Sequence, residues 1–332
     1  MTGLGMRKNK ILSIVILLFL FLGCLYLSVF AGHDGFGVDL FLKSFQLNDR
    51  SEDAVILELI RYPRAIKAIV AGVCLALAGL FLQTVSKNPL AEPYITGISS
   101  GAGLGIVLSV LFFNSANYSF FGFLGAMVSS LLVISFAGFR KFSITKLILV
   151  GLSINIFVSA LISMIILMNS EKSYSMLYIL SGNLTENNLV SDKHLLLIFF
   201  VILLFSAFLI PKLNFLRLDE GMVFSSVKHK NMYSIFFIIC SALLTSLSVL
   251  AAGILGFIGI IAPLISKMIV GQDFRYLFFV NIFLGASLIL FADFLSRTLI
   301  YPMQIPLGLV VAFIGAPVFV FFLTKKGDIL ND

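Results

Sequence analysis

Long apolar runs without a single charged residue alternate with short polar segments along the whole chain. Asp, Glu, Lys and Arg are absent from seven runs, which cover residues 11–32, 68–86, 93–139, 147–170, 231–266, 276–292 and 298–324. A helix needs about 20 apolar residues to cross the hydrocarbon core of a bilayer. The run 93–139 is therefore long enough for two spans, with the polar segment NSANYS (114–119) as their turn. The run 231–266 similarly holds one full span and a shorter one.

This pattern predicts an all-α, polytopic membrane protein with ten transmembrane helices in a single transmembrane domain over residues 1–332. The apolar residues do not alternate with polar ones, as they do in the strands of a membrane β-barrel. The predicted helices cover residues 11–31, 65–86, 98–113, 119–139, 145–168, 195–211, 232–252, 256–270, 276–296 and 305–324.

The composition supports a membrane protein, since 60% of the residues are hydrophobic, 12% are charged and the mean hydropathy is +1.09. The three cysteines, Cys24, Cys74 and Cys240, all lie inside apolar spans. We expect them to be small buried side chains, not disulfides or metal ligands. The first span lacks a small-x-small cleavage site, so we expect it to remain as a helix.

The distribution of basic residues predicts the orientation of the helices. With ten spans both termini lie on one side, and the segments on that side hold 15 of the 23 Lys and Arg residues and six of the 16 acids. Because basic residues accumulate on the cytoplasmic side of a membrane, both termini are predicted to be cytoplasmic. These residues are spread over short segments without a basic stripe, so the pI near 9.3 does not indicate nucleic-acid binding.

Two polar segments fall on the predicted cytoplasmic side. The segment NPLAEPYITGISSGAG (88–103) follows the second predicted helix, and Pro89 and Pro93 discourage that helix from continuing. The segment 211–231 is the longer one. It places apolar residues at three- or four-residue spacing, at Leu216, Leu218, Met222, Val223 and Val227. This spacing predicts a short amphipathic helix outside the membrane, which is either an interfacial helix or a docking element for a cytoplasmic subunit.

Four charges lie at the margins of predicted spans on the outer side. Arg61 and Arg64 precede the second predicted helix, and Arg297 follows the ninth, with Asp293 one turn before it. The residues are compatible with interfacial anchoring that includes an Asp293–Arg297 pair at i, i+4. They are equally compatible with a basic outer site for an acidic partner.

Motifs of catalysis are missing from the sequence. No Walker A, GxGxxG, HExxH or CxxC motif occurs, and the three histidines lie far apart in the sequence. We therefore expect a transport subunit without its own ATPase site, which is not an enzyme and binds no metal or cofactor itself.

Several motifs occur in order along the chain. They are RYPR (61–64), then Gly72, Leu75, Gly79 and Gln83, then NPLAEPYITGISSGAG (88–103), AGILGFIGIIAPLISKMIVGQDFR (252–275) and QIPLG with GAP (304–317). On these motifs the chain resembles the permease subunit of ABC importers for iron-siderophore, haem and vitamin B12, the FecCD-type of the type II importers. The sequence departs from the family pattern at Leu264 (usually His), Lys267 (Arg) and Gln304 (Glu), and it contains no Trp. In the cytoplasmic segment, Asp219 and Val227 replace two glycines.

The resemblance implies a set of partners in the bacterial plasma membrane. They are a second permease subunit (forming a homodimer or a dimer with a close homologue), two cytoplasmic ATPase subunits that bind ATP and Mg²⁺, and an extracytoplasmic substrate-binding lipoprotein. By the family motifs, Arg61, Arg64 and Arg297 would dock the binding protein. The cytoplasmic gate would be formed by Asn88, Leu90, Ile144 and Thr145. The ATPase coupling residues would be Arg217, Leu218, Asp219, Glu220, Met222, Val223 and Val227.

The function implied is ATP-driven import of a chelated iron compound, a ferric siderophore or haem. The motifs are shared between cargoes, so vitamin B12 remains an alternative. A self-sufficient secondary transporter and an accessory membrane protein are two further alternatives. Secondary transporters usually place ionisable groups or unwound helices near the bilayer midplane, whereas Asp293 lies near an outer end here.

Overall fold

The computed structural model describes residues 3–32, 37, 55–93, 97–113, 117–138, 144–184, 192–216 and 227–325. Every regular element in these ranges is a helix. The helices are α1 (Gly3–Val29), the π-helix η1 (Leu57–Arg61), α4 (Tyr62–Ser86), α5 (Ile98–Phe113), α6 (Tyr118–Ala137), α7 (Ile144–Met168), α8 (Ser170–Leu180), α9 (Asp192–Leu216), α10 (Val227–Ala252), α11 (Ile258–Val270), α12 (Phe274–Thr298) and α13 (Leu307–Lys325). The prediction of an all-α membrane protein is confirmed.

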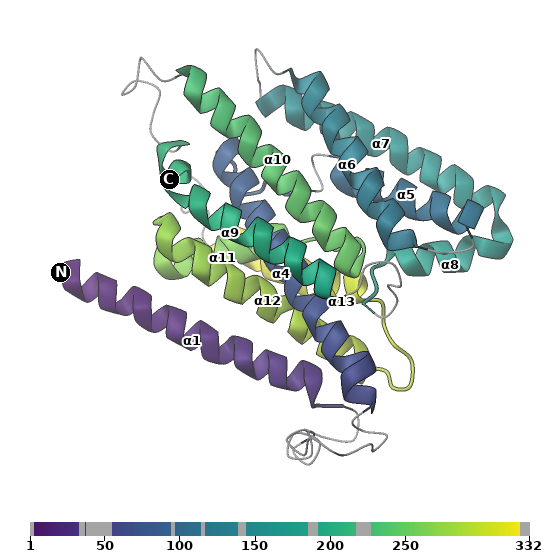
Figure 1. Ribbon diagram of the computed structural model, residues 1–332, viewed down its shortest axis with the longest axis horizontal. Helices are drawn as coiled ribbons and strands as arrows, with labels where there is room; N and C mark the ends of the chain where they lie inside the picture. The colour runs from purple at the N-terminus through teal and green to yellow at the C-terminus, as the bar shows by residue number, and fades with distance from the viewer. Residues whose placement is uncertain are drawn as a thin grey trace.

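Each of the ten predicted spans overlaps one helix of the structure. Within the described residues, six helical stretches are long and apolar enough to cross a membrane, and four more are shorter apolar helices. In Figure 1, α1 and α10 begin at one end of the array, and α4 begins at the opposite end, so these helices alternate in direction.

The structure differs from the sequence-based expectation at two helices. We expected Arg61 and Arg64 ahead of the second span, but η1 and α4 run on from one another, so both arginines lie within helix. Pro63 is the second residue of α4 and directly follows this junction. Helix α8 was not predicted at all, because its sequence SEKSYSMLYIL is short and begins with polar residues.

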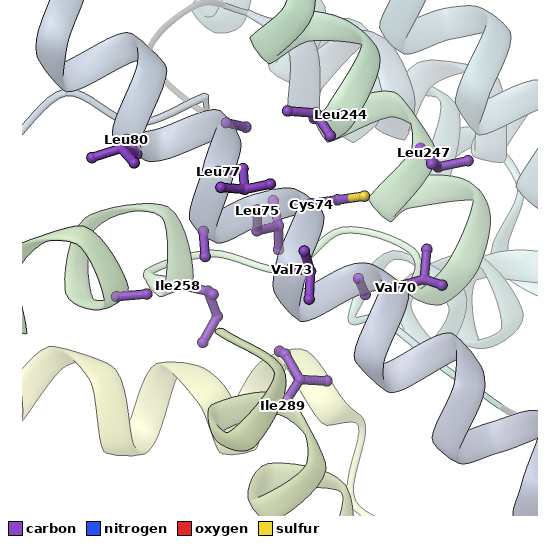
Figure 2. Close-up of a cluster of buried hydrophobic side chains, with 14 of the residues drawn as sticks. Val70, Val73, Cys74, Leu75, Leu77, Leu80, Leu244, Leu247, Ile258 and Ile289 are labelled. Carbon is purple, nitrogen blue, oxygen red and sulfur yellow. The ribbon is translucent and has the colours of Figure 1, made fainter. Parts of the chain in front are cut away.

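Helix α4 forms the centre of the molecule and is buried along nearly its whole length. It packs against α10, α11 and α12, and Figure 2 shows Cys74 and Leu77 of α4 among side chains from these helices. Two glycines allow backbones to approach closely. A Cβ at Gly72 would lie 2.2 Å from the carbonyl oxygen of Gly285 in α12, and a Cβ at Gly79 would lie 1.9 Å from that of Gly259 in α11. Small residues at such contacts are typical of helices that associate in membranes.

Helices α5 to α8 form a second group on one side of α10 (Figure 1). A small apolar core joins α5 to α8, with Ile106 and Val110 packed near Met176. The outer face of α7 is different, because Ile156 and Phe157 are exposed in the isolated chain. This group therefore leaves a broad apolar surface that no described part of the chain covers.

The turn between α10 and α11 lies beside the middle of the molecule and not at its edge. Gly253 and Phe257 have positive φ angles of 75° and 65°, which lets the chain reverse within a few residues. Helix α11 then begins against Gly79 of α4, and Pro93 of the segment after α4 also lies against Gly259. The fold therefore brings the segment 87–93 to the first turn of α11.

Candidate functional site

A buried cluster of charged residues joins α4 and α12 at the outer end predicted from the charge distribution. Arg64 Nε donates a hydrogen bond to Asp293 Oδ1 at 2.5 Å, and Arg64 Nη1 donates to Gln304 Oε1 at 3.1 Å. The exposed fractions of the Arg64 and Asp293 side chains are 6% and 0%. Charges buried to this extent are stable only when they are paired.

Arg297 completes the pairing of Asp293 and ties α1 to the cluster. Its Nε lies 3.3 Å from Asp293 Oδ2, which confirms the i, i+4 pair expected from the sequence. Its Nη2 donates to the carbonyl oxygen of Ser28, whose hydroxyl donates to Asp293 Oδ2 at 3.1 Å. The carboxylate of Asp293 thus accepts hydrogen bonds from Ser28 and Arg64 and forms an ion pair with Arg297, which links three helices.

Arg61 stands next to this cluster. Its Nη1 donates to the carbonyl oxygens of Val29 and Phe30 at 2.9 and 3.0 Å, where α1 ends. The three arginines predicted from the family motifs are therefore brought together by the fold, and two of them, Arg64 and Arg297, share Asp293.

The predicted cytoplasmic gate residues lie in two places. Lys87 ends α4 with a left-handed backbone (φ 52°), and Asn88 Oδ1 then accepts a hydrogen bond from the N–H of Leu90 at 2.9 Å. Asn88 and Leu90 are partly buried in this tight turn. Ile144 and Thr145 form the first turn of α7, and among the described residues no hydrogen bond links them to Asn88 or Leu90. Their role as a gate stays a prediction.

Most of the predicted ATPase coupling segment lies outside the described residues. This holds for Arg217, Leu218, Asp219, Glu220, Met222 and Val223. The flanks of the predicted segment 211–231 are described. Residues 211–216 continue α9, and Val227 is the first residue of α10. The predicted amphipathic helix would have to fit between these two ends.

A cavity of about 290 Å³, which the sequence analysis did not predict, lies next to the segment that follows α4. Residues from four segments line it: Glu92, Leu180, Ser181, Ile254, Gly256, Phe257, Gly308, Leu309 and Ala312. Burial raises the pKa of the Glu92 carboxyl to about 7. A hydrogen bond that the carboxyl accepts from the backbone N–H of Phe257 lowers the pKa, but this effect is the smaller of the two. The only signal in the sequence was one acid inside the NPLAEP motif.

Three further hydrogen bonds hold the cavity walls together. The backbone N–H groups of Leu307 and Gly308 donate to the carbonyls of Gly182 and Ser181, and that of Asn183 donates to Ala252. A Cβ at Gly308 would lie 2.4 Å from the carbonyl oxygen of Ser181, so the start of α13 can meet the end of α8 only with glycine there. Backbone hydrogen bonds thus fix the relative positions of the segments that form the walls.

Comparisons with known proteins agree with this architecture. A model of the FecCD transport family matches residues 17–325. The Fe(3+)-citrate import system permease protein YfmD of Bacillus subtilis is 29% identical over 327 residues, which cover 96% of each chain. The probable siderophore transport system permease protein YfhA of the same organism is 33% identical over 285 residues, or 82% of each chain. A solved inward-facing structure of a metal-chelate type ABC transporter has a TM-score of 0.81 and 27% identity, and covers 95% of this chain and 99% of that one.

Proposed function

Since this chain belongs to the FecCD transport family, we propose that it is the permease subunit of an ATP-driven importer for a chelated iron compound, a ferric siderophore or haem. An extracytoplasmic binding protein would deliver the cargo, and two ATPase subunits would supply the energy from the cytoplasmic side. The observation that carries the proposal is the match over residues 17–325, together with relatives that are named as iron-citrate and siderophore permeases.

The arginine cluster supports docking of an acidic binding protein. The guanidinium groups of Arg61 and Arg297 are partly exposed and can attract carboxylates, and such charge complementarity raises both specificity and association rate. Arg64 is 6% exposed and already paired with Asp293. We therefore assign the direct contacts to Arg61 and Arg297, and assign Arg64 a contribution to the local positive field.

Cargo passage would follow from movement at the cytoplasmic end. Closure of the ATPase dimer would push on the residues between α9 and α10, and this push would shift the first turn of α7 and the turn at Asn88 and Leu90. Packed helices switch between discrete arrangements more readily than they deform, so a rigid push suits this bundle. The second permease subunit would cover the apolar face that α7 leaves exposed.

Reconstitution in proteoliposomes tests the proposal. The chain is combined with its partner subunits and binding protein, and uptake of radioactive ferric siderophore and of haem is followed. We expect uptake that requires ATP and persists when the proton gradient is collapsed. Uptake that stops when the proton gradient is collapsed and does not require ATP would indicate a secondary transporter. Uptake of vitamin B12 without either iron compound would assign the alternative cargo.

A further inference from the structure

Glu92 is the only ionisable side chain among the residues that line the cavity described above. The other walls contribute alkyl groups, one aromatic ring, backbone and the hydroxyl of Ser181. Among the described residues of its own segment, the nearest other ionisable side chain is Lys87, five positions earlier and exposed. No cation from the cavity walls therefore pairs with the Glu92 carboxyl, in contrast with Asp293.

The cavity reaches the surface of the chain. Leu309 lines it and is 45% exposed, and Phe313, one turn further along α13, is 78% exposed. The opening thus lies on a face that no described part of this chain covers. Water-sized and larger molecules can enter there, and whatever enters meets one carboxyl group in surroundings that are otherwise uncharged.

A single carboxylate in this cavity discriminates between entering molecules by their charge. Interactions between charges are several times stronger at the reduced dielectric constant near protein than in bulk water. The carboxylate therefore attracts cationic groups, accepts hydrogen bonds from amide or hydroxyl donors, and repels anions. It forms one edge of a cavity beside the turn that carries the predicted gate residues Asn88 and Leu90.

We propose that Glu92 is a charge-selecting residue of the transport path, which favours neutral or cationic iron chelates over polyanionic ones. The proposal rests on the proposed function for its cargo, but the electrostatic selectivity of the cavity can be measured without any cargo. It differs from a purely structural role, in which Glu92 would only hold the first turn of α11 through Phe257.

Glu92→Gln separates the charge from the structural contact. The glutamine side-chain oxygen can still accept the hydrogen bond from the Phe257 N–H, so the link to α11 is retained while the charge is lost. Glu171→Gln is the matched control, because Glu171 is exposed in the first turn of α8 and does not line the cavity.

The probe is a pair of methanethiosulfonate reagents, one with a trimethylammonium group and one with a sulfonate group. Each reacts with a cysteine introduced by Ala312→Cys, or by Leu309→Cys as a second position, in the assembled transporter. Protein without an added cysteine gives the background from Cys24, since Cys74 and Cys240 are buried. The ratio of cationic to anionic rate at one pH cancels the ionisation of the thiol itself.

We expect Glu92→Gln to lower this ratio about tenfold at pH 8, and Glu171→Gln to leave it unchanged. In the parent protein the ratio should rise between pH 6 and pH 8, as Glu92 loses its proton. An unchanged ratio in Glu92→Gln, or no reaction at either position, would overturn the proposal. If the transporter carried no ferric chelate, the proposed function would fail while the reagent ratio still reported on the cavity.

Discussion

Asp293 and Glu92 are both acids in the interior of a membrane protein, yet their surroundings differ completely. Asp293 has no exposed surface, and its two oxygens accept hydrogen bonds from Arg64 and Ser28 and form an ion pair with Arg297. Glu92 receives one backbone N–H, has no cation among the walls of its cavity, and has its pKa raised to about 7 by burial.

The comparison distinguishes two roles for a carboxylate. Asp293 holds helices together, whereas Glu92 has no counter-charge among the walls of its cavity and can interact with molecules that enter it. The hydrogen bonds and ion pairs of Asp293 join α1, α4 and α12. The unpaired carboxyl of Glu92 contributes little to packing and can take up or release a proton near neutral pH. Buried ionisable groups without a structural partner are concentrated at functional sites.

The largest effect is expected from Asp293→Ala. The substitution leaves Arg64 buried without a counter-charge, so the free energy of unfolding should fall by about 3–5 kcal/mol. A thiol-reactive dye follows thermal unfolding through the buried Cys74 and Cys240. Asp273→Ala, which removes the N-cap of α12, is the control and should cost only about 1 kcal/mol. Equal losses in the two variants would show that the cluster contributes no special stability.

A smaller effect on the free energy of unfolding is expected from the ionisation of Glu92. Its pH dependence is opposite to that of most carboxylates in folded proteins. Its folded-state pKa of about 7 exceeds its ordinary value of 4.5, so the folded protein holds the proton more tightly. The stabilisation is complete below about pH 4.5, and it is lost as the pH rises through 7, by about 3 kcal/mol in total.

Thermal unfolding of the parent protein and of Glu92→Gln between pH 5 and pH 8 measures this term. The parent should lose stability over that range relative to the variant. A difference between the two that stays constant with pH would mean that Glu92 ionises as an ordinary exposed acid.

A third and still smaller effect concerns Gln304, which stands where the family pattern has Glu. Gln304 accepts from Arg64 and is exposed, so a carboxylate introduced at this position would be screened by solvent. In an Asp293→Asn background, Gln304→Glu should restore about 0.5–1 kcal/mol by giving Arg64 a new carboxylate. The same thermal-unfolding assay compares the stability of the double variant with that of Asp293→Asn. Further destabilisation by the added acid would mean that Arg64 needs no counter-charge at its outer side.

The sequence predicted the helical bundle and the three arginines but not what surrounds them. Apolar runs report span length directly, so all ten predicted ranges coincide with helices, whereas the short and partly polar α8 gave no such signal. The RYPR motif located Arg61 and Arg64, but the shared acid was visible only as a partner of Arg297, four residues away. Glu92 was missed because the walls of its cavity come from four segments far apart in sequence.

The most direct test of the account compares Arg61→Gln with Glu92→Gln in the affinity of the assembled transporter for its binding protein. Arg61 is partly exposed and its Nη1 donates to carbonyl oxygens at the end of α1, and we expect Arg61→Gln to keep the fold. We predict about fivefold weaker binding in Arg61→Gln, with a weaker salt dependence, and unchanged binding in Glu92→Gln. Equal affinity of both variants and the parent would contradict docking at the arginine cluster.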